Sequence, residues 1–167
     1  MFGEGTYAPQ FETHGTAVID LDASSNYDPA AFHRLVNNLR PASHDILQTN
    51  SPISGCWGRT AAKVSGVPNI VSVEHNVHVE YAQFTRVVNG LTLPLADAVV
   101  GVSEAVSDSY LGWEEQLLGD AARRVTIRNG VDIERIRETF GRADDVLTEY
   151  TPFSPSDFII GTMGRLH

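Results

Sequence analysis

The sequence has one cysteine, one lysine and no long apolar run, and each shortage narrows what the protein can be. With Cys56 alone, no intrachain disulfide can form, which favours a reducing compartment, and we expect the cytoplasm. No stretch approaches the roughly 20 apolar residues that span a bilayer. We therefore predict no transmembrane segment, while peripheral membrane contact stays open. Residues 1–5 lack the cationic and apolar pattern of a secretory signal.

Positive charge is also scarce. The formal net charge is −9, from 12 basic and 21 acidic residues, and Lys63 is the only lysine. Because nucleic-acid binding needs a clustered basic surface, we expect no nucleic acid among the partners. An acidic surface almost free of lysine fits salt adaptation, since dissolved salt screens the self-repulsion. It fits an ordinary acidic protein from an arginine-rich proteome equally well, and both interpretations stay open.

Short apolar runs alternate with segments of helical spacing along most of the chain. The runs predict six strands, at residues 15–21 (with the apolar run at 17–19), 45–49, 69–74, 97–102, 124–128 and 158–162. Strands that alternate with helices indicate parallel β-α-β units. We therefore predict an α/β fold with a Rossmann-like parallel sheet and helices on both faces. Residues 132–155, charged and then rich in Pro, Ser and Thr, predict a short helix and a linker.

Local signals mark where the helices begin, where they end and which face they bury. Asp28 and Pro29 form a typical helix start, and Gly66 suits a left-handed helix end. Apolar residues at helical spacing predict four buried faces. These are Phe32, Leu35, Val36 and Leu39; Trp57, Ala61 and Val64; Tyr81, Phe84, Val88 and Leu91; and Val106, Tyr110 and Leu117.

Polar residues or glycine follow five of the predicted strands. They are Asn50, His75, Ser103, Asn129 and Gly164. In open parallel sheets ligands bind outside the carboxyl ends of the strands, so we predict a binding site there. Plain structural roles compete with this interpretation: Ser103 suits a helix cap, and Asn129 with Gly130 suits a tight turn.

Two histidines close together raise the question of a metal site. His75 and His78 lie near Glu74 and Glu80. Zinc-binding helices usually carry His-Glu-x-x-His, with the ligands one turn apart. Here the histidines are three residues apart in a predicted loop, and we predict no metal site.

Four segments carry more information together than they do singly. They are HDILQTNSPISGCWGRTAAKVSGVPNIVSVEHNV, ADAVVGVSEAVSDSYL, RVTIRNGVDIERI and FIIGTMGRLH. In this order and at this spacing they resemble the family 4 glycosyltransferases, in which two Rossmann-like domains face each other across a cleft. The resemblance covers about residues 16–167. It implies an acceptor-side domain over residues 16–131, a linker over 132–155 and the first strand of a donor-side domain over 156–167.

The resemblance also implies an activity and a set of site residues. The family transfers a sugar from a nucleotide-diphosphate sugar to an acceptor with retention, generally without a metal or other cofactor. His75 would orient the acceptor or stabilise developing charge. Gly164 and Arg165 would contact the donor diphosphate, where glycine allows close approach and guanidinium gives paired contacts. The acceptor side of the cleft would be lined by Asn50, Ser51, Ser103, Asn129 and Gly130.

The chain departs from the family pattern at both ends. The family's first strand and Gly-rich loop are not found before residue 16. The family's Gly-Arg-Leu motif is followed by a lysine and by paired glutamates, and neither is found after Leu166. We therefore expect a chain truncated at both ends and inactive alone, with an acceptor (a glycan, a lipid or a small molecule) that the sequence leaves open. Two alternatives remain: a non-catalytic binding subunit that needs a partner chain, and an enzyme similar to nucleotide-sugar epimerases.

Overall fold

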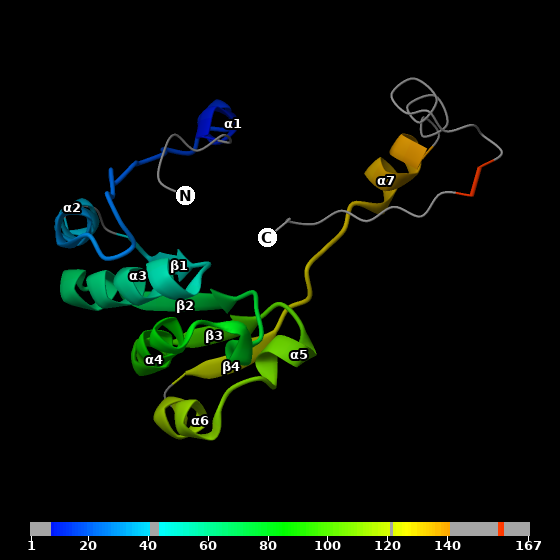
Figure 1. Cartoon of the computed structure of the whole chain (residues 1–167). Coiled ribbons are helices and arrows are strands. Elements are labelled where there is room, and N and C mark those ends of the chain that lie inside the picture. Colours follow the sequence, from blue (N-terminus) through cyan, green and yellow to red (C-terminus); the bar gives the residue numbers. More distant parts are fainter. Residues whose placement is uncertain (1–7, 41–43, 121, 141–156, 159–167) are drawn as a thin grey trace. The chain divides into compact units, whose positions relative to one another are not determined.

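The computed structural model describes residues 8–40, 44–120, 122–140 and 157–158 (Figure 1). By its internal contacts the chain divides into two units, Met1–Asn129 and Gly130–His167. In the second unit the structure describes one helix, α7 (Ile133–Phe140), at the predicted place of a short helix. Asp132 starts it by accepting a hydrogen bond from the Arg135 backbone N–H (3.0 Å).

The first unit is built on a parallel sheet. Its strands are β1 (Ile46–Thr49), β2 (Asn69–Glu74), β3 (Ala98–Gly101) and β4 (Arg123–Thr126). They lie in the order β1-β2-β3-β4, and each neighbouring pair is parallel. The parallel α/β sheet is thus confirmed, and four of the six predicted strands form it. Parallel order brings all four carboxyl ends to one edge.

In this unit the helices that follow β1 lie in the connections between the strands and pack around the sheet, whereas two described helices precede β1 (Figure 1). In chain order the helices are α1 (Ala8–Thr13), α2 (Pro29–Leu39), α3 (Pro52–Ser65), α4 (Gln83–Thr92), α5 (Glu104–Ser107) and α6 (Gly112–Leu118). Two short 3-10 helices, η1 (His78–Glu80) and η2 (Leu93–Leu95), flank α4. α1 was not predicted, because its sequence shows no apolar period.

The predicted helix signals act as the sequence indicates. The Asp28 side chain accepts from the backbone N–H groups of Ala30 and Ala31, and Pro29 opens α2. Gly66 ends α3 with a φ of 79°, in the left-handed region where glycine is favoured. The Ser103 hydroxyl caps α5 by accepting from the Val106 N–H (3.2 Å). These signals succeed because each is satisfied within a few residues of chain.

The apolar core has two parts. The larger joins α3, β2, β3 and α6 through Ala62, Val67, Ile70, Leu93, Ala96, Val99, Tyr110, Leu118 and Ala122. The smaller packs α2 on α3 through Val36, Leu39 and Ala61, with Phe32, Leu35 and Leu47 beside them. The predicted buried face of α2 is therefore confirmed.

The strand predicted at residues 15–21 does not form. Residues 16–23, all of them described, have no regular structure, and the side chain of Ile19 is 61% exposed. Two carbonyls of this segment instead accept from the Arg34 guanidinium, those of Leu21 (2.7 Å) and Asp22 (2.7 Å). An apolar run becomes a strand only where a neighbour completes its backbone hydrogen bonds. Of the sixth predicted strand, the structure describes only exposed Phe158; the rest lies outside the described residues.

Three of the predicted helix faces are partly wrong. Val64, Phe84 and Leu91 are exposed, and Leu118 is buried in place of Leu117. α4 instead buries Asn89 and Gly90, because Gly90 leaves room for the ring of Trp113, and a Cβ at that position would collide with it. The single helix predicted after Ser103 is divided into α5 and α6.

We predict that Gly101→Ala destabilises the fold. α5 crosses so close to the end of β3 that a Cβ on Gly101 would lie 3.0 Å from the backbone nitrogen and 3.2 Å from the Cα of Ser107. Overpacking of this kind lowers the free energy of unfolding by about 1–3 kcal/mol, which urea denaturation would measure. Gly112→Ala is the matched control, since no described residue comes within 4 Å of the added Cβ. Equal stability of the two variants would contradict the prediction.

Candidate functional site

The predicted site residues of the first unit lie along the carboxyl edge of the sheet. Asn50 directly follows β1, His75 directly follows β2, and Ser103 lies two residues beyond β3. The side chains of Asn50 and His75 are exposed, and Ser103 is half-buried. Because β1, β2 and β3 are neighbours in the sheet, these three residues mark one continuous edge.

The two predicted site residues at the end of β1 have local partners. Asn50 Oδ1 accepts from Gln48 Nε2 (2.9 Å). The hydroxyls of Ser51 and Ser54 are 2.6 Å apart in the first turn of α3. Together these contacts place one amide and two hydroxyl groups at the carboxyl end of β1.

Asn129 and Gly130 do not form the predicted tight turn. The described residues 127–132 contain no turn, and the φ of Gly130 is not positive. The Ile127 N–H instead donates to the Gly101 carbonyl (3.0 Å), which extends the pairing of β4 with β3. The chain then runs on through Asn129, the last residue of the first unit, to Gly130, the first of the second. Gly164 and Arg165 lie outside the described residues.

A pocket of about 510 Å³ opens between α2 and the start of α3. Its lining includes the predicted site residue Ser51 and also Ser54. The rings of Phe32 and Trp57 form an aromatic wall, with centroids 5.0 Å apart. The indole N–H of Trp57 donates to the Asn26 carbonyl (2.8 Å) and fixes that wall. The pocket thus offers an apolar surface with hydroxyl groups beside it.

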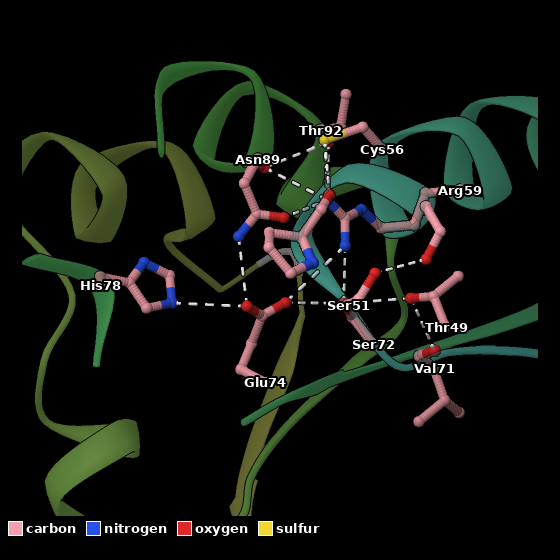
Figure 2. A network of polar contacts seen from close by, with 12 residues as sticks. Thr49, Ser51, Cys56, Arg59, Val71, Ser72, Glu74, His78, Asn89 and Thr92 are labelled. Atoms are coloured by element: carbon pink, nitrogen blue, oxygen red, sulfur yellow. Dashed lines mark hydrogen bonds and ion pairs between the residues drawn. The ribbon is translucent and has the colours of Figure 1, made fainter. Parts of the chain in front are cut away.

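Behind the exposed edge lies a buried polar network that the sequence did not reveal (Figure 2). At its centre, Arg59 of α3 has 0% of its surface exposed. Its Nη1 donates to Ser72 Oγ on β2 (2.6 Å). Its Nη2 donates to two oxygens of α4, Asn89 Oδ1 (2.7 Å) and Thr92 Oγ1 (2.7 Å). One guanidinium thereby joins α3, β2 and α4.

Glu74, the last residue of β2, is the carboxylate of this network. Figure 2 shows it between Arg59 and His78. Its Oε1 lies 3.8 Å from Arg59 Nη1 and accepts from Ser72 Oγ (3.0 Å). Its Oε2 accepts from the Tyr81 hydroxyl (3.2 Å) and from Asn89 Nδ2 (3.2 Å). The residue directly before His75 is therefore fixed from several sides.

His78 connects the network to α6. Its Nδ1 lies 3.0 Å from Glu114 Oε1, and both side chains are fully buried. Glu114 Oε2 accepts from the Leu111 N–H (2.8 Å), which closes the start of α6. The His78 backbone N–H donates to Ser109 Oγ (3.0 Å), and its ring packs on Tyr110 with centroids 4.2 Å apart.

Burial and the two carboxylates set the charge states around the network. Burial, with the negative charge of Glu74, raises the pKa of the Tyr81 and Tyr110 hydroxyls well above their usual range. Burial also raises the pKa of the Cys56 thiol. These groups stay neutral at physiological pH. Burial lowers the pKa of Arg59, but guanidinium keeps its proton in proteins.

The sequence held a partial signal for this network. Ile70, Ser72 and Glu74 alternate with valines along β2, so a strand with one buried face buries all three. A carboxylate in that position needs a buried cation, and Arg59 lies among small residues of α3. What the sequence does not contain is the pairing itself. His78 and Glu114, for example, are 36 residues apart.

Four parallel strands in sequential order, with polar groups at their carboxyl edge, define a Rossmann-like α/β domain. A family model described as Glycosyltransferase Family 4 matches residues 3–135, which is most of the chain. The protein therefore belongs to glycosyltransferase family 4, as its sequence motifs indicate. Comparison with curated proteins gave no match. Within the described residues no helix is long and apolar enough to cross a membrane.

The pocket residue Asp28 should make stability depend on acid. Hydrogen bonds from Ser24, and from the first turn of α2, lower its pKa from 3.8 to about 2. The contribution of its carboxylate is complete above about pH 4 and is lost as the pH falls toward about 2. Asp28→Asn should remove this part of the acid sensitivity in urea titrations, and Asp120→Asn, an exposed residue after α6, should keep it. An unchanged acid profile in Asp28→Asn would contradict this assignment.

Replacing Arg59 alone should be far more damaging than replacing an exposed arginine. Arg59→Met leaves the Glu74 carboxylate buried without its cation, and breaking a buried pair lowers the free energy of unfolding by about 3–5 kcal/mol. Arg128→Met, which breaks an exposed pair with Glu104, should change it little. The double variant Arg59→Met with Glu74→Leu should recover part of the loss. Denaturant unfolding of all three tests this, and a mild effect of Arg59→Met would contradict it.

Proposed function

We propose that this chain supplies the acceptor side of a retaining glycosyltransferase that uses a nucleotide-diphosphate sugar. The observation that carries the proposal is the family match over residues 3–135, which include the sheet and its carboxyl edge. In the proposed reaction the bond between the anomeric carbon and the diphosphate oxygen breaks. A bond from that carbon to an acceptor oxygen forms on the same face of the sugar, and the acceptor's proton passes to the leaving diphosphate.

His75 is the residue we propose to act on the acceptor. It lies exposed at the end of β2, and the buried Glu74 directly before it fixes its backbone. An imidazole can donate or accept a hydrogen bond, so it can orient an acceptor hydroxyl or stabilise developing charge. Asn50 and Ser103, just beyond the ends of the neighbouring strands β1 and β3, would line the same edge.

The pocket beside α3 is the proposed acceptor subsite. The wall of Phe32 and Trp57 suits the apolar face of a sugar ring or an aglycone. The hydroxyls of Ser51 and Ser54 can exchange hydrogen bonds with acceptor hydroxyls at the rim. This chemistry favours an acceptor that combines an apolar face with hydroxyl groups.

For the donor, the proposal follows the family resemblance. Gly164 and Arg165 would contact the diphosphate, and Asn129 and Gly130 would lead from the acceptor side toward it. Positive side chains and helix N-termini, rather than a metal, would neutralise the leaving group. Because the family holds the nucleotide in a second Rossmann-like domain, we expect turnover to require a donor-side domain.

The test is sugar transfer by the chain alone and by the chain joined to a donor-side domain of the family, with a panel of nucleotide sugars. We expect turnover from the joined protein only. In that protein His75→Ala should lower kcat by roughly 10²–10⁴-fold, the usual contribution of a group that assists proton transfer. Nucleotide binding, measured by titration, should not change.

His33→Ala is the matched control, because His33 is an exposed histidine on α2 that does not line the pocket. Turnover by the isolated chain would refute the need for a donor-side domain. Unchanged kcat in His75→Ala would remove His75 from the reaction.

A further inference from the structure

The loop that carries His75 lies between two buried polar side chains. It spans residues 75–77, between Glu74 at the end of β2 and His78 at the start of η1. Glu74 and His78 are 1% and 0% exposed, whereas His75 is exposed. The position of His75 therefore depends on how firmly these two anchors are held.

His78 faces charged or titratable groups from every element packed around it. Glu74 approaches from β2, Glu114 from α6, Tyr81 from the end of η1, and Tyr110 from the segment between α5 and α6. Arg59, on α3, lies on the other side of Glu74, with its Nη1 3.8 Å from the Glu74 carboxylate. The protonation of His78 is set inside this group.

The two ring nitrogens of His78 both point toward carboxylates. Nδ1 lies 3.0 Å from Glu114 Oε1, so Nδ1–H is the donor of that hydrogen bond. Nε2 lies 3.7 Å from Glu74 Oε2, and among the described residues it has no hydrogen-bond partner. An unprotonated Nε2 would turn its lone pair toward an anionic oxygen. A protonated Nε2 turns a positive N–H toward it.

The charge balance favours the same proton. With a neutral His78, the buried group contains one cation, Arg59, and two carboxylates, Glu74 and Glu114. One negative charge would then have no counter-ion, which is strongly unfavourable away from water. A second proton on His78 makes the group neutral, with the two cations and the two carboxylates in contact.

We propose that His78 is an imidazolium bridging Glu74 and Glu114, and that it is the positioning residue for the loop that bears His75. The benefit to catalysis rests on the function proposed for His75. The charge state and the fixed loop do not, because both follow from the contacts of the buried group. The role proposed for His75 needs a geometry held to fractions of an ångström, and a buried charged residue at each end of the short loop fixes that geometry.

Nuclear magnetic resonance of the ¹⁵N-labelled chain tests the charge state without any substrate. Long-range ¹H–¹⁵N spectra at neutral pH should show protons on both ring nitrogens of His78. His78→Gln should remove this signal and identify it, whereas His33→Gln should leave it in place. A singly protonated His78 overturns the proposal.

The Glu114→Gln variant separates the charge balance from a merely structural role, because only the charge balance predicts a change in the protonation of His78. It keeps the shape of the side chain but removes one negative charge, so the charge balance no longer requires the second proton. His78 should then appear singly protonated at the same pH. If His78 keeps both protons in this variant, the balance of the four buried charges does not control its protonation, and the proposal fails.

Hydrogen exchange tests the positioning role. His78→Asn can keep a donor near Glu114 but loses the group that faces Glu74. The amides of residues 75–77 should exchange roughly 10-fold faster or more, the effect of losing one buried polar contact. The β3 amides are the internal control. Equal acceleration in β3 would mean general destabilisation and would overturn local positioning.

If the loop loosens as expected but His75→Ala leaves transfer unchanged, the function proposed for His75 fails and this inference stands.

Discussion

The buried guanidinium of Arg59 constrains the carboxyl end of β2 and the two helices α3 and α4. A cation without exposed surface must find its hydrogen-bond acceptors inside the protein, and here they come from β2 and α4. It also needs a carboxylate, which Glu74 provides. α3, β2 and α4 are therefore held in one arrangement by directional bonds, in addition to apolar contact. A sliding of any of these elements would leave a buried charge without partners.

The core changes character along a single strand. Near its amino end β2 contributes Ile70 to the apolar cluster, and toward its carboxyl end the same face carries Ser72 and Glu74 into the polar network. Apolar packing tolerates small shifts, whereas a network of charged groups specifies one geometry. The stiffest part of the interior thus lies directly beneath the edge that bears His75. A glycosyltransferase that must present an acceptor hydroxyl to an anomeric carbon benefits from rigidity at that place.

Local signals predicted much of the fold, and long-range pairing accounts for the errors. The strands that became β1 to β4, the cap of α2 and the end at Gly66 each depend on a few consecutive residues. The run at residues 17–19 is as apolar as those of the four strands, but no described strand lies beside it to pair with. The sequence of the run cannot show whether such a partner exists. Leu117 was predicted to be buried, but its neighbour Leu118 is buried instead. The break between α5 and α6 turns the second helix, and with it the face that meets the core. Of the site, the strand ends could be foreseen. The network could not, since Arg59 and Asn89 are 30 residues apart.

The contact between His78 and Glu114 also restricts how this sequence can evolve. Each of the four buried charges is tolerable only in the presence of the others, so a substitution of one member is selected against before a second can compensate. Lineages that exchange the network for an apolar core must pass through an unstable intermediate or change two positions together. Residues on α3, β2, η1 and α6 should therefore be inherited as a block, while the exposed Asn76, beside His75, stays free to diversify.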